Sequence, residues 1–170
     1  MEYSLEVFKQ LFSSIRKKDG LLSYMHKNPD AFTPLVKLSL MSTPEAWRAS
    51  WLVGHIMLKN DKRIQSSVPT MIDSLLLLNQ GHQRQTLIIL LNMFLDDNQQ
   101  GKLFDHCLTI WENIKIIPST RITAMKFILK TVDKFPDLKP EIKLWTQDKY
   151  LESLSPGIKN SLLKQLKKIE

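Results

Sequence analysis

The chain has 170 residues, of which 43% are hydrophobic and 24% are charged, and this balance excludes a disordered chain. Lysine and arginine outnumber aspartate and glutamate by 24 to 17, and the net charge of +7 is compatible with an acidic partner, nucleic acid included, although solvated lysines at helix ends are the preferred interpretation. The length predicts a single domain over residues 1–170 with a hydrophobic core. The single cysteine, Cys107, excludes an internal disulfide and is typical of a reducing compartment.

The N-terminal segment shows no export signal, because it lacks a basic stretch followed by a small-residue cleavage site. The longest apolar run, Leu87 to Leu91, is too short to cross a membrane. We therefore expect a cytoplasmic protein that makes no membrane contact.

The first predicted elements are helices within residues 4–27. Leu5 and Phe8 begin a series of apolar residues that follows one helical face. Ser4 is a candidate N-cap, and Gly20, after a run of basic residues, is expected to end the first helix.

Four pairs of helices are predicted to follow, and in each pair two amphipathic segments are joined by a short loop. Thr43 and Pro44 are suited to restarting the chain as a helix, as is Pro156, while the polar run 96–101 is expected to be a connector. Because no pair could bury its apolar side alone, neighbouring pairs must stack. The pairs cover residues 30–59, 67–95, 102–133 and 137–169.

One pattern recurs in the second helix of every pair. A basic residue near the start is followed by apolar side chains three and four positions later, and the basic residues are 36, 37 and 38 positions apart. Self-similarity at this period predicts an all-α fold, a right-handed α–α superhelix of about four helix pairs plus an N-terminal helix. The four basic residues are Arg48, Arg84, Arg121 and Lys159.

The apolar stripes of these segments define a predicted hydrophobic core. It comprises Leu5, Phe8, Phe12, Leu35, Leu38, Trp51, Leu52, Ile56, Leu75, Leu78, Leu87, Leu91, Phe104, Leu108, Ile128, Leu144, Leu151, Leu162 and Leu166. Replacing one of these leucines by alanine is expected to cost ~2–5 kcal/mol.

The recurring pattern resembles the HEAT repeat of the ARM/HEAT class. The second helix of that repeat typically starts with a hydrophobic residue and an arginine, followed by small or apolar residues. Trp47-Arg48 with Trp51, and Thr120-Arg121, resemble this start well. The resemblance implies that the second helices line a concave surface that binds protein. The aspartate that HEAT repeats often carry shortly before the arginine is absent here.

The chain is also similar to small bacterial HEAT-like proteins that are sometimes labelled adenylosuccinate lyase. True lyases of that superfamily are far longer and carry a signature loop with a catalytic serine and a nearby lysine and asparagine. The serine pairs Ser13-Ser14 and Ser66-Ser67 lack such surroundings. Lyase activity is therefore the third alternative, after the two binding functions given below.

The four basic residues and Trp47 are the candidate partner-binding residues. In stacked repeats the basic residues should form a row, and two interpretations of that row are open. The side chains either bond loop carbonyls and knit the repeats together, or they bind an acidic peptide or a phosphate backbone. Trp47 and Trp51 share one helix face and are either anchors for a partner or part of the core.

No catalytic or metal-binding motif is found. The four histidines have no metal-ligand spacing, no glycine-rich phosphate loop occurs, and Cys107 lacks a positive cluster that would activate its thiol. We predict no enzymatic activity, no cofactor and no metal.

The favoured hypothesis is therefore a non-catalytic scaffold whose concave face binds a protein. The alternative is nucleic-acid binding through the basic row, since some DNA glycosylases that act on alkylated bases are built from HEAT-like repeats with a basic concave face. The sequence predicts neither the identity of the partner nor the oligomeric state.

Overall fold

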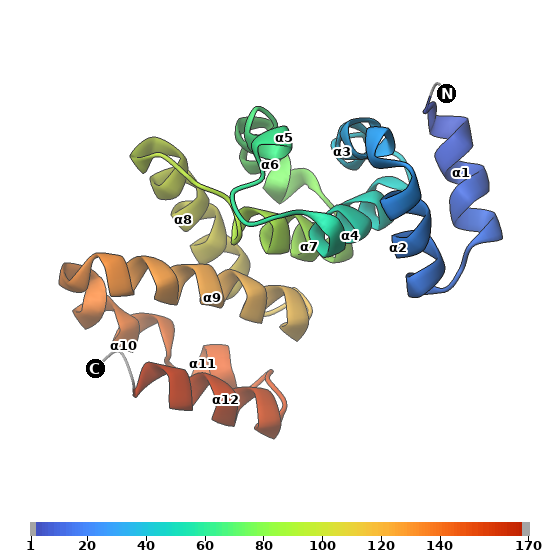
Figure 1. Cartoon of the computed structure of the whole chain (residues 1–170). Coiled ribbons are helices and arrows are strands. Elements are labelled where there is room, and N and C mark those ends of the chain that lie inside the picture. Colours follow the sequence, from blue (N-terminus) through green and yellow to red (C-terminus); the bar gives the residue numbers. More distant parts are fainter. Residues whose placement is uncertain (1–2, 168–170) are drawn as a thin grey trace. The chain divides into compact units, whose positions relative to one another are not determined.

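A computed structural model describes residues 3–167 (Figure 1). Within this range the chain forms twelve α-helices, three short 3₁₀ helices and no strand, which confirms the predicted all-α fold. The chain divides into two compact units, residues 1–96 and 97–170. The superhelical path of the repeats and their assembly into one domain stay predictions.

The first unit consists of two N-terminal helices followed by two helix pairs. Its elements are α1 (Leu5–Ser14), α2 (Lys18–Lys27), η1 (Pro29–Ala31), α3 (Phe32–Ser39), α4 (Ala46–Ile56), α5 (Lys62–Gln65), α6 (Val68–Ser74), η2 (Leu75–Leu77) and α7 (Gln80–Leu90). The second helices of the two pairs, α4 and α7, pack against each other, and α4 also packs against α3 and α2. Figure 1 shows α4 and α7 side by side. The stacking of neighbouring pairs is therefore present in this unit.

The second unit starts with two long helices that pack together, α8 and α9, and ends with shorter elements. These elements are α8 (Asp97–Glu112), α9 (Pro118–Lys134), η3 (Pro136–Glu141), α10 (Ile142–Trp145), α11 (Asp148–Leu151) and α12 (Pro156–Leu166). The helix predicted from Asp137 is wrong as a continuous element. Pro140 lies inside η3 and has no N–H to donate, so the segment breaks into short turns.

Two further boundaries differ from the sequence prediction. The connector predicted at 96–101 is wrong from Asp97 onward, since these residues form the first turns of α8, where Asp97 suits the positive end of the helix dipole. The last predicted helix extends to Ile169, which lies outside the described residues; α12 ends at Leu166.

Gly20 does not end the first helix. That helix ends at Ser14, where Ile15 takes an extended backbone conformation, and Gly20 lies in the first turn of α2. A Cβ on Gly20 would lie 2.6 Å from Cγ2 of Ile15, so the glycine permits the close approach of the α1–α2 turn to α2.

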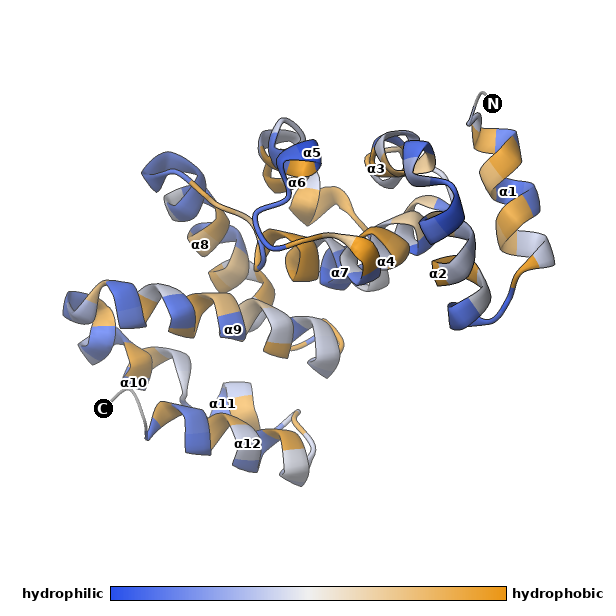
Figure 2. Cartoon of the chain, viewed as in Figure 1, coloured by the Kyte–Doolittle hydropathy of each residue, from blue (hydrophilic) through white to orange (hydrophobic). Residues whose placement is uncertain are grey.

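The core follows the apolar stripes, and Figure 2 shows apolar and polar segments alternating along helices such as α1, α9 and α12. Leu144 is the one wrong assignment, with 54% of its surface exposed, because α10 is a single turn that buries Ile142 and Trp145 instead. The predicted core residues that are buried are Phe8, Phe12, Leu35, Leu38, Leu52, Leu75, Leu87, Ile128, Leu151, Leu162 and Leu166. The half-buried ones are Leu5, Trp51, Ile56, Leu78, Leu91, Phe104 and Leu108.

Candidate functional site

The start of α4 carries the first of the predicted binding residues. The guanidinium of Arg48 donates from Nη1 to the carbonyl of Phe12 at 2.6 Å and from Nη2 to the carbonyl of Ile15 at 2.9 Å. These carbonyls lie at the C-terminal end of α1, where a helix leaves its last carbonyls without intrahelical partners. The same guanidinium lies 5.0 Å from the ring centroid of Phe12. Arg48 therefore anchors α1 to α4.

A surface hollow of about 270 Å³ lies beside Arg48 and is called the Trp47 hollow below. Its lining consists of Arg16, Leu21, Trp47, Arg48 and Trp51. Leu21 is buried, Trp51 is half-buried and Trp47 is 46% exposed. The α1–α2 turn and α2 supply one side of the hollow, and one face of α4 supplies the other.

His55 continues this face of α4 by one further turn. Its ring lies 4.3 Å from the ring of Trp51, centroid to centroid, and its Nδ1 lies 2.8 Å from the carbonyl oxygen of Trp51. An N–H on Nδ1 would donate to this carbonyl. The ring contact and the hydrogen bond hold His55 against Trp51 and limit the freedom of the indole inside the hollow.

Arg16 lines the hollow, and two further cations, Lys17 and Lys18, follow Arg16 directly in the sequence. All three are exposed, and none of them has a hydrogen bond or an ion pair from its side chain to any residue between 3 and 167. Lys17 is also the N-cap of α2, and it provides no side-chain hydrogen bond to the first N–H groups of that helix. Asp19 is the one acidic residue of this stretch. The turn therefore presents uncompensated positive charge.

Arg84, the equivalent residue at the start of α7, has different surroundings from Arg48. It is half-buried, and its Nε is buried without a hydrogen-bond partner in the described part of the chain. Oε1 of the buried neighbour Gln83 likewise has none. The repeat position alone thus does not determine what the basic side chain binds.

His82 makes the polar connection between α7 and the α3–α4 pair. Its Nε2 lies 2.8 Å from Oγ of Ser50 and 3.0 Å from the carbonyl oxygen of Ser39. Burial lowers the pKa of His82, and the hydrogen bond to Ser39 raises it by less. The side chain is 4% exposed, so this histidine has a role in packing.

Arg121, at the start of α9, is completely buried. Its Nε donates to the carbonyl of Trp111 at 2.8 Å and its Nη2 to the carbonyl of Tyr150 at 2.8 Å, while Nη1 donates to Oγ of Ser153. Its guanidinium also lies 4.6 Å from the ring centroid of Trp111. Burial lowers the pKa of Arg121. All three nitrogens are committed to the second unit, so Arg121 knits α8, α9 and α11 together.

Lys159, the fourth predicted member of the row, lies on α12 and is half-buried. Its ammonium has no hydrogen bond or ion pair with residues of the described range. Arg48 and Arg84 belong to the first unit, whereas Arg121 and Lys159 belong to the second. Arg121 is completely buried and cannot line the predicted common groove, which stays a prediction for the other three residues.

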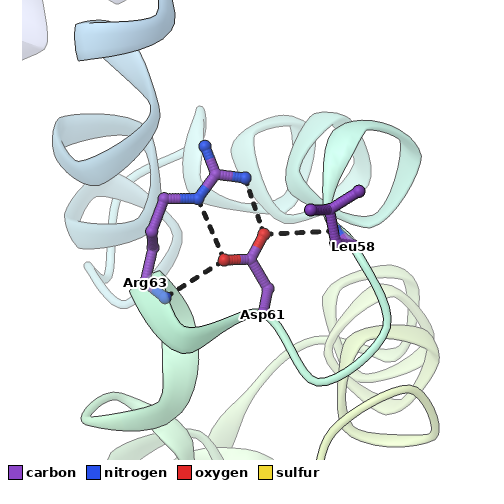
Figure 3. A network of polar contacts seen from close by, with 3 residues as sticks. All are labelled: Leu58, Asp61 and Arg63. Atoms are coloured by element: carbon purple, nitrogen blue, oxygen red, sulfur yellow. Dashed lines mark hydrogen bonds and ion pairs between the residues drawn. The ribbon is translucent and has the colours of Figure 1, made fainter.

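Asp61 and Arg63 form a network that the repeat pattern does not reveal (Figure 3). The carboxylate of Asp61 accepts hydrogen bonds from Nε of Arg63 at 2.9 Å and Nη2 at 2.6 Å, and from the backbone N–H groups of Leu58 and Arg63 at 3.1 Å each. Chiefly because of the side-chain bonds to Arg63, the pKa of Asp61 is lowered to about 2. The guanidinium also lies 3.6 Å from the ring centroid of Phe32. The network caps α5 and joins it to α3.

The remaining chemistry-bearing groups give no reaction centre. Cys107 is completely buried, and burial raises the pKa of its thiol, which stays protonated. In the range that the structure describes, no three histidine, cysteine, aspartate or glutamate side chains could together hold a metal ion. None of the described helices combines the length and the apolar character needed to span a membrane.

Comparison with known proteins identifies a family for this chain. A family model described as a HEAT repeat domain matches residues 9–169, which confirms the resemblance based on the second helices. A search of curated proteins found no match, and neither did a search of solved structures. The similarity to proteins labelled adenylosuccinate lyase and the bacterial origin receive no support from these comparisons.

Proposed function

Because the chain belongs to the HEAT repeat domain family, we propose that it is a non-catalytic scaffold that binds another protein through its second helices. HEAT repeats generally serve as protein-interaction scaffolds. The observation that carries the proposal is the exposed indole of Trp47 at the start of α4, in a hollow that Arg48 also lines. Tryptophan and arginine are enriched among the few residues that supply most of the binding energy in protein interfaces.

The five predicted binding residues take different parts in this proposal. Trp47 contacts the partner directly, and Arg48 holds the wall of the hollow in place through its bonds to α1. Arg121 is left out of the binding surface, because it is buried and bonded within its own unit. Arg84 and Lys159 are half-buried and stay predicted contacts.

The absence of catalysis is part of the proposal, and three side chains support it. The thiol of Cys107 is buried and protonated, the ring of His82 is enclosed between Ser39 and Ser50, and the carboxylate of Asp61 is bonded to Arg63. These three groups are thus occupied with packing. We further propose that the protein acts in the cytoplasm, where a free buried cysteine is unexceptional.

The proposal is tested by affinity capture from the source cells with three forms of the chain: wild type, Trp47→Ala and Leu77→Ala. Leu77 is a matched control, since it is an 86% exposed apolar residue of the same unit on η2. We expect a partner that wild type and Leu77→Ala retain and that Trp47→Ala loses. A partner retained equally by all three forms would remove the Trp47 hollow from the proposal, and failure to capture any protein would contradict the scaffold itself.

A second candidate function is nucleic-acid binding, and the unpaired cations Arg16, Lys17 and Lys18 are the observation that favours it. If these three residues neutralised three phosphates of duplex DNA, the logarithm of affinity would fall with the logarithm of salt concentration with a slope of about −3. Retention on duplex DNA across a salt series measures this slope. Binding that does not change with salt, or no binding at low salt, would reject this candidate.

A further inference from the structure

We infer that the Trp47 hollow binds an acidic segment of a partner protein, which inserts one apolar side chain between Trp47 and Trp51 and places carboxylates beside Arg16 and Lys17. This inference deepens the proposed function and rests on it. The contact lies on the first unit alone.

The size and lining of the hollow fit a single side chain. At about 270 Å³ it is smaller than the roughly 300–1,000 Å³ of pockets that hold cofactor-sized or drug-sized molecules. Leu21 is buried in its wall, and the two indoles lie one helical turn apart on α4. Such surroundings favour an aliphatic or aromatic side chain over a polar one, because burial of apolar surface is the main favourable term.

The charges at the mouth of the hollow select the residues that flank this side chain. Arg16 lines the hollow, and Lys17 and Lys18 follow it on the exposed turn without an ion pair to any described residue. The first N–H groups of α2 add positive potential, because no side chain caps them. Asp19 offsets only part of this charge. Carboxylates next to the inserted side chain would supply the missing counter-charges.

Two features favour a protein segment over single-stranded nucleic acid. Proteins that bind single-stranded nucleic acid use a positively charged groove along several phosphates and several aromatic rings on which successive bases stack. Here Trp47 is the one strongly exposed aromatic ring of the hollow, Trp51 is half-buried with its ring in tilted contact with His55, and the cations form one short run. A single exposed aromatic ring beside one short run of cations fits a short acidic peptide better than a nucleic-acid strand.

The test begins with selection from a library of random displayed peptides on the full-length chain. Selected peptides are then measured by fluorescence anisotropy against wild type, Trp47→Ala and the double variant Arg16→Glu, Lys17→Glu. The matched control is Lys37→Glu, Lys59→Glu, which changes two exposed lysines of the same unit and shifts the net charge equally. Thermal melts verify that each variant is folded, and an oligothymidylate is titrated in parallel.

We expect the selected peptides to share aspartate or glutamate on either side of a leucine, isoleucine, phenylalanine or tryptophan. Trp47→Ala should weaken their binding by about thirtyfold or more, as for a residue at the centre of an interface. The Arg16, Lys17 double variant should weaken it about tenfold at low salt and less at high salt, whereas the control double variant should change it less than about threefold.

Three results would overturn the inference. Selection that yields no peptide, or peptides without acidic residues, would reject the acidic segment. An equal loss of peptide affinity in the two double variants would show that the net charge of the chain, and not Arg16 and Lys17 in particular, affects binding. Tighter binding of oligothymidylate than of every selected peptide, with loss in Trp47→Ala, would assign the hollow to nucleic acid. In each case, a cellular partner whose capture still depended on Trp47 would leave the scaffold function in place, so that the two failures can be told apart.

Discussion

The starts of α4 and α9 carry the same sequence pattern and use it differently. In both, the arginine donates to carbonyls at the C-terminal ends of neighbouring helices. Arg48 reaches back to α1, in the part of the chain that precedes its own helix pair. Arg121 instead bonds Trp111 at the end of its own partner helix and Tyr150 in the elements that follow.

The different bonding of the two arginines is accompanied by a different exposure of the residue that precedes each of them. Trp47 is 46% exposed, whereas Thr120 is completely buried. In the first unit Arg48 bonds to α1 and leaves the aromatic surface of Trp47 exposed beside it. In the second unit Arg121 and Thr120 are both completely buried. A repeat arginine can therefore act as an internal cross-link in one unit and as the support of a surface in the other, and variants can separate the two roles.

The largest expected effect is that of Arg121→Ala. The change leaves the buried carbonyl of Trp111 without its donor, at ~1–3 kcal/mol for a buried unsatisfied group, and removes the part-buried bonds to the carbonyl of Tyr150 and the hydroxyl of Ser153. We expect a loss of at least about 3 kcal/mol in the free energy of unfolding, measured by urea denaturation. Arg121→Lys, which keeps the charge but not the planar fork of donors, should recover only part of it. A loss below about 1 kcal/mol would contradict the cross-linking role.

The Asp61–Arg63 network should show a pH dependence that Arg48 and Arg121 cannot, because carbonyls do not titrate. The pKa of Asp61 falls from an ordinary 3.8 to about 2 in the folded chain. Its stabilising effect is therefore complete above pH 3.8 and is lost as the pH falls through about 2. The difference corresponds to about 2 kcal/mol. Wild type should lose this much more stability than Asp61→Asn between pH 5 and pH 2, as measured by urea denaturation at each pH. Parallel losses in the two proteins would contradict the assignment.

Arg48→Ala is expected to cost less than Arg121→Ala, about 1–2 kcal/mol. The side chain is half-buried, so water can reach part of the site and replace some of the lost bonds to Phe12 and Ile15. Urea denaturation measures the cost, and peptide binding to the same variant shows whether the Trp47 hollow depends on the anchoring of α1. If Arg48→Ala lowered the free energy of unfolding as much as Arg121→Ala, the two arginines would contribute equally to stability, contrary to this comparison of α4 and α9.

The sequence predicted the second helices well because their signals are local. Apolar residues at helical spacing, and prolines such as Pro118 and Pro156 in the first turn, depend only on neighbours along the chain. The same local logic failed where polar residues form a helix, as in the first turns of α8, and where Pro140 interrupts one. Polarity alone does not distinguish an exposed helical turn from a connector.

The partners of the arginines could not be predicted, for a different reason. Arg48 and Arg121 bond backbone carbonyls, which every residue possesses, so no side-chain pattern marks the acceptors. The connection from His82 to Ser39 and Ser50 joins residues 43 and 32 positions apart and likewise has no local signal. The Trp47 hollow depends on the α1–α2 turn, and the sequence predicted that the first helix ends at Gly20, whereas it ends at Ser14. What could be found from the sequence was the pair of tryptophans on one face of α4.

The smallest expected effect concerns the middle of α4 and α9, where the two helices differ again at an equivalent position. Gly54 of α4 corresponds to the buried Phe127 of α9, six residues after the respective arginine. A Cβ on Gly54 would meet Cγ2 of Ile88 at 3.6 Å and Cγ1 of Ile89 at 3.8 Å, which are ordinary contact distances. Gly54→Ala should therefore stabilise the chain by about 0.5–1 kcal/mol, because alanine favours the helix and restricts the unfolded chain. Thermal and urea unfolding measure the gain. Destabilisation would show that α4 packs against α7 more tightly than these distances indicate, so that α4, like α9, would leave no free space at this position.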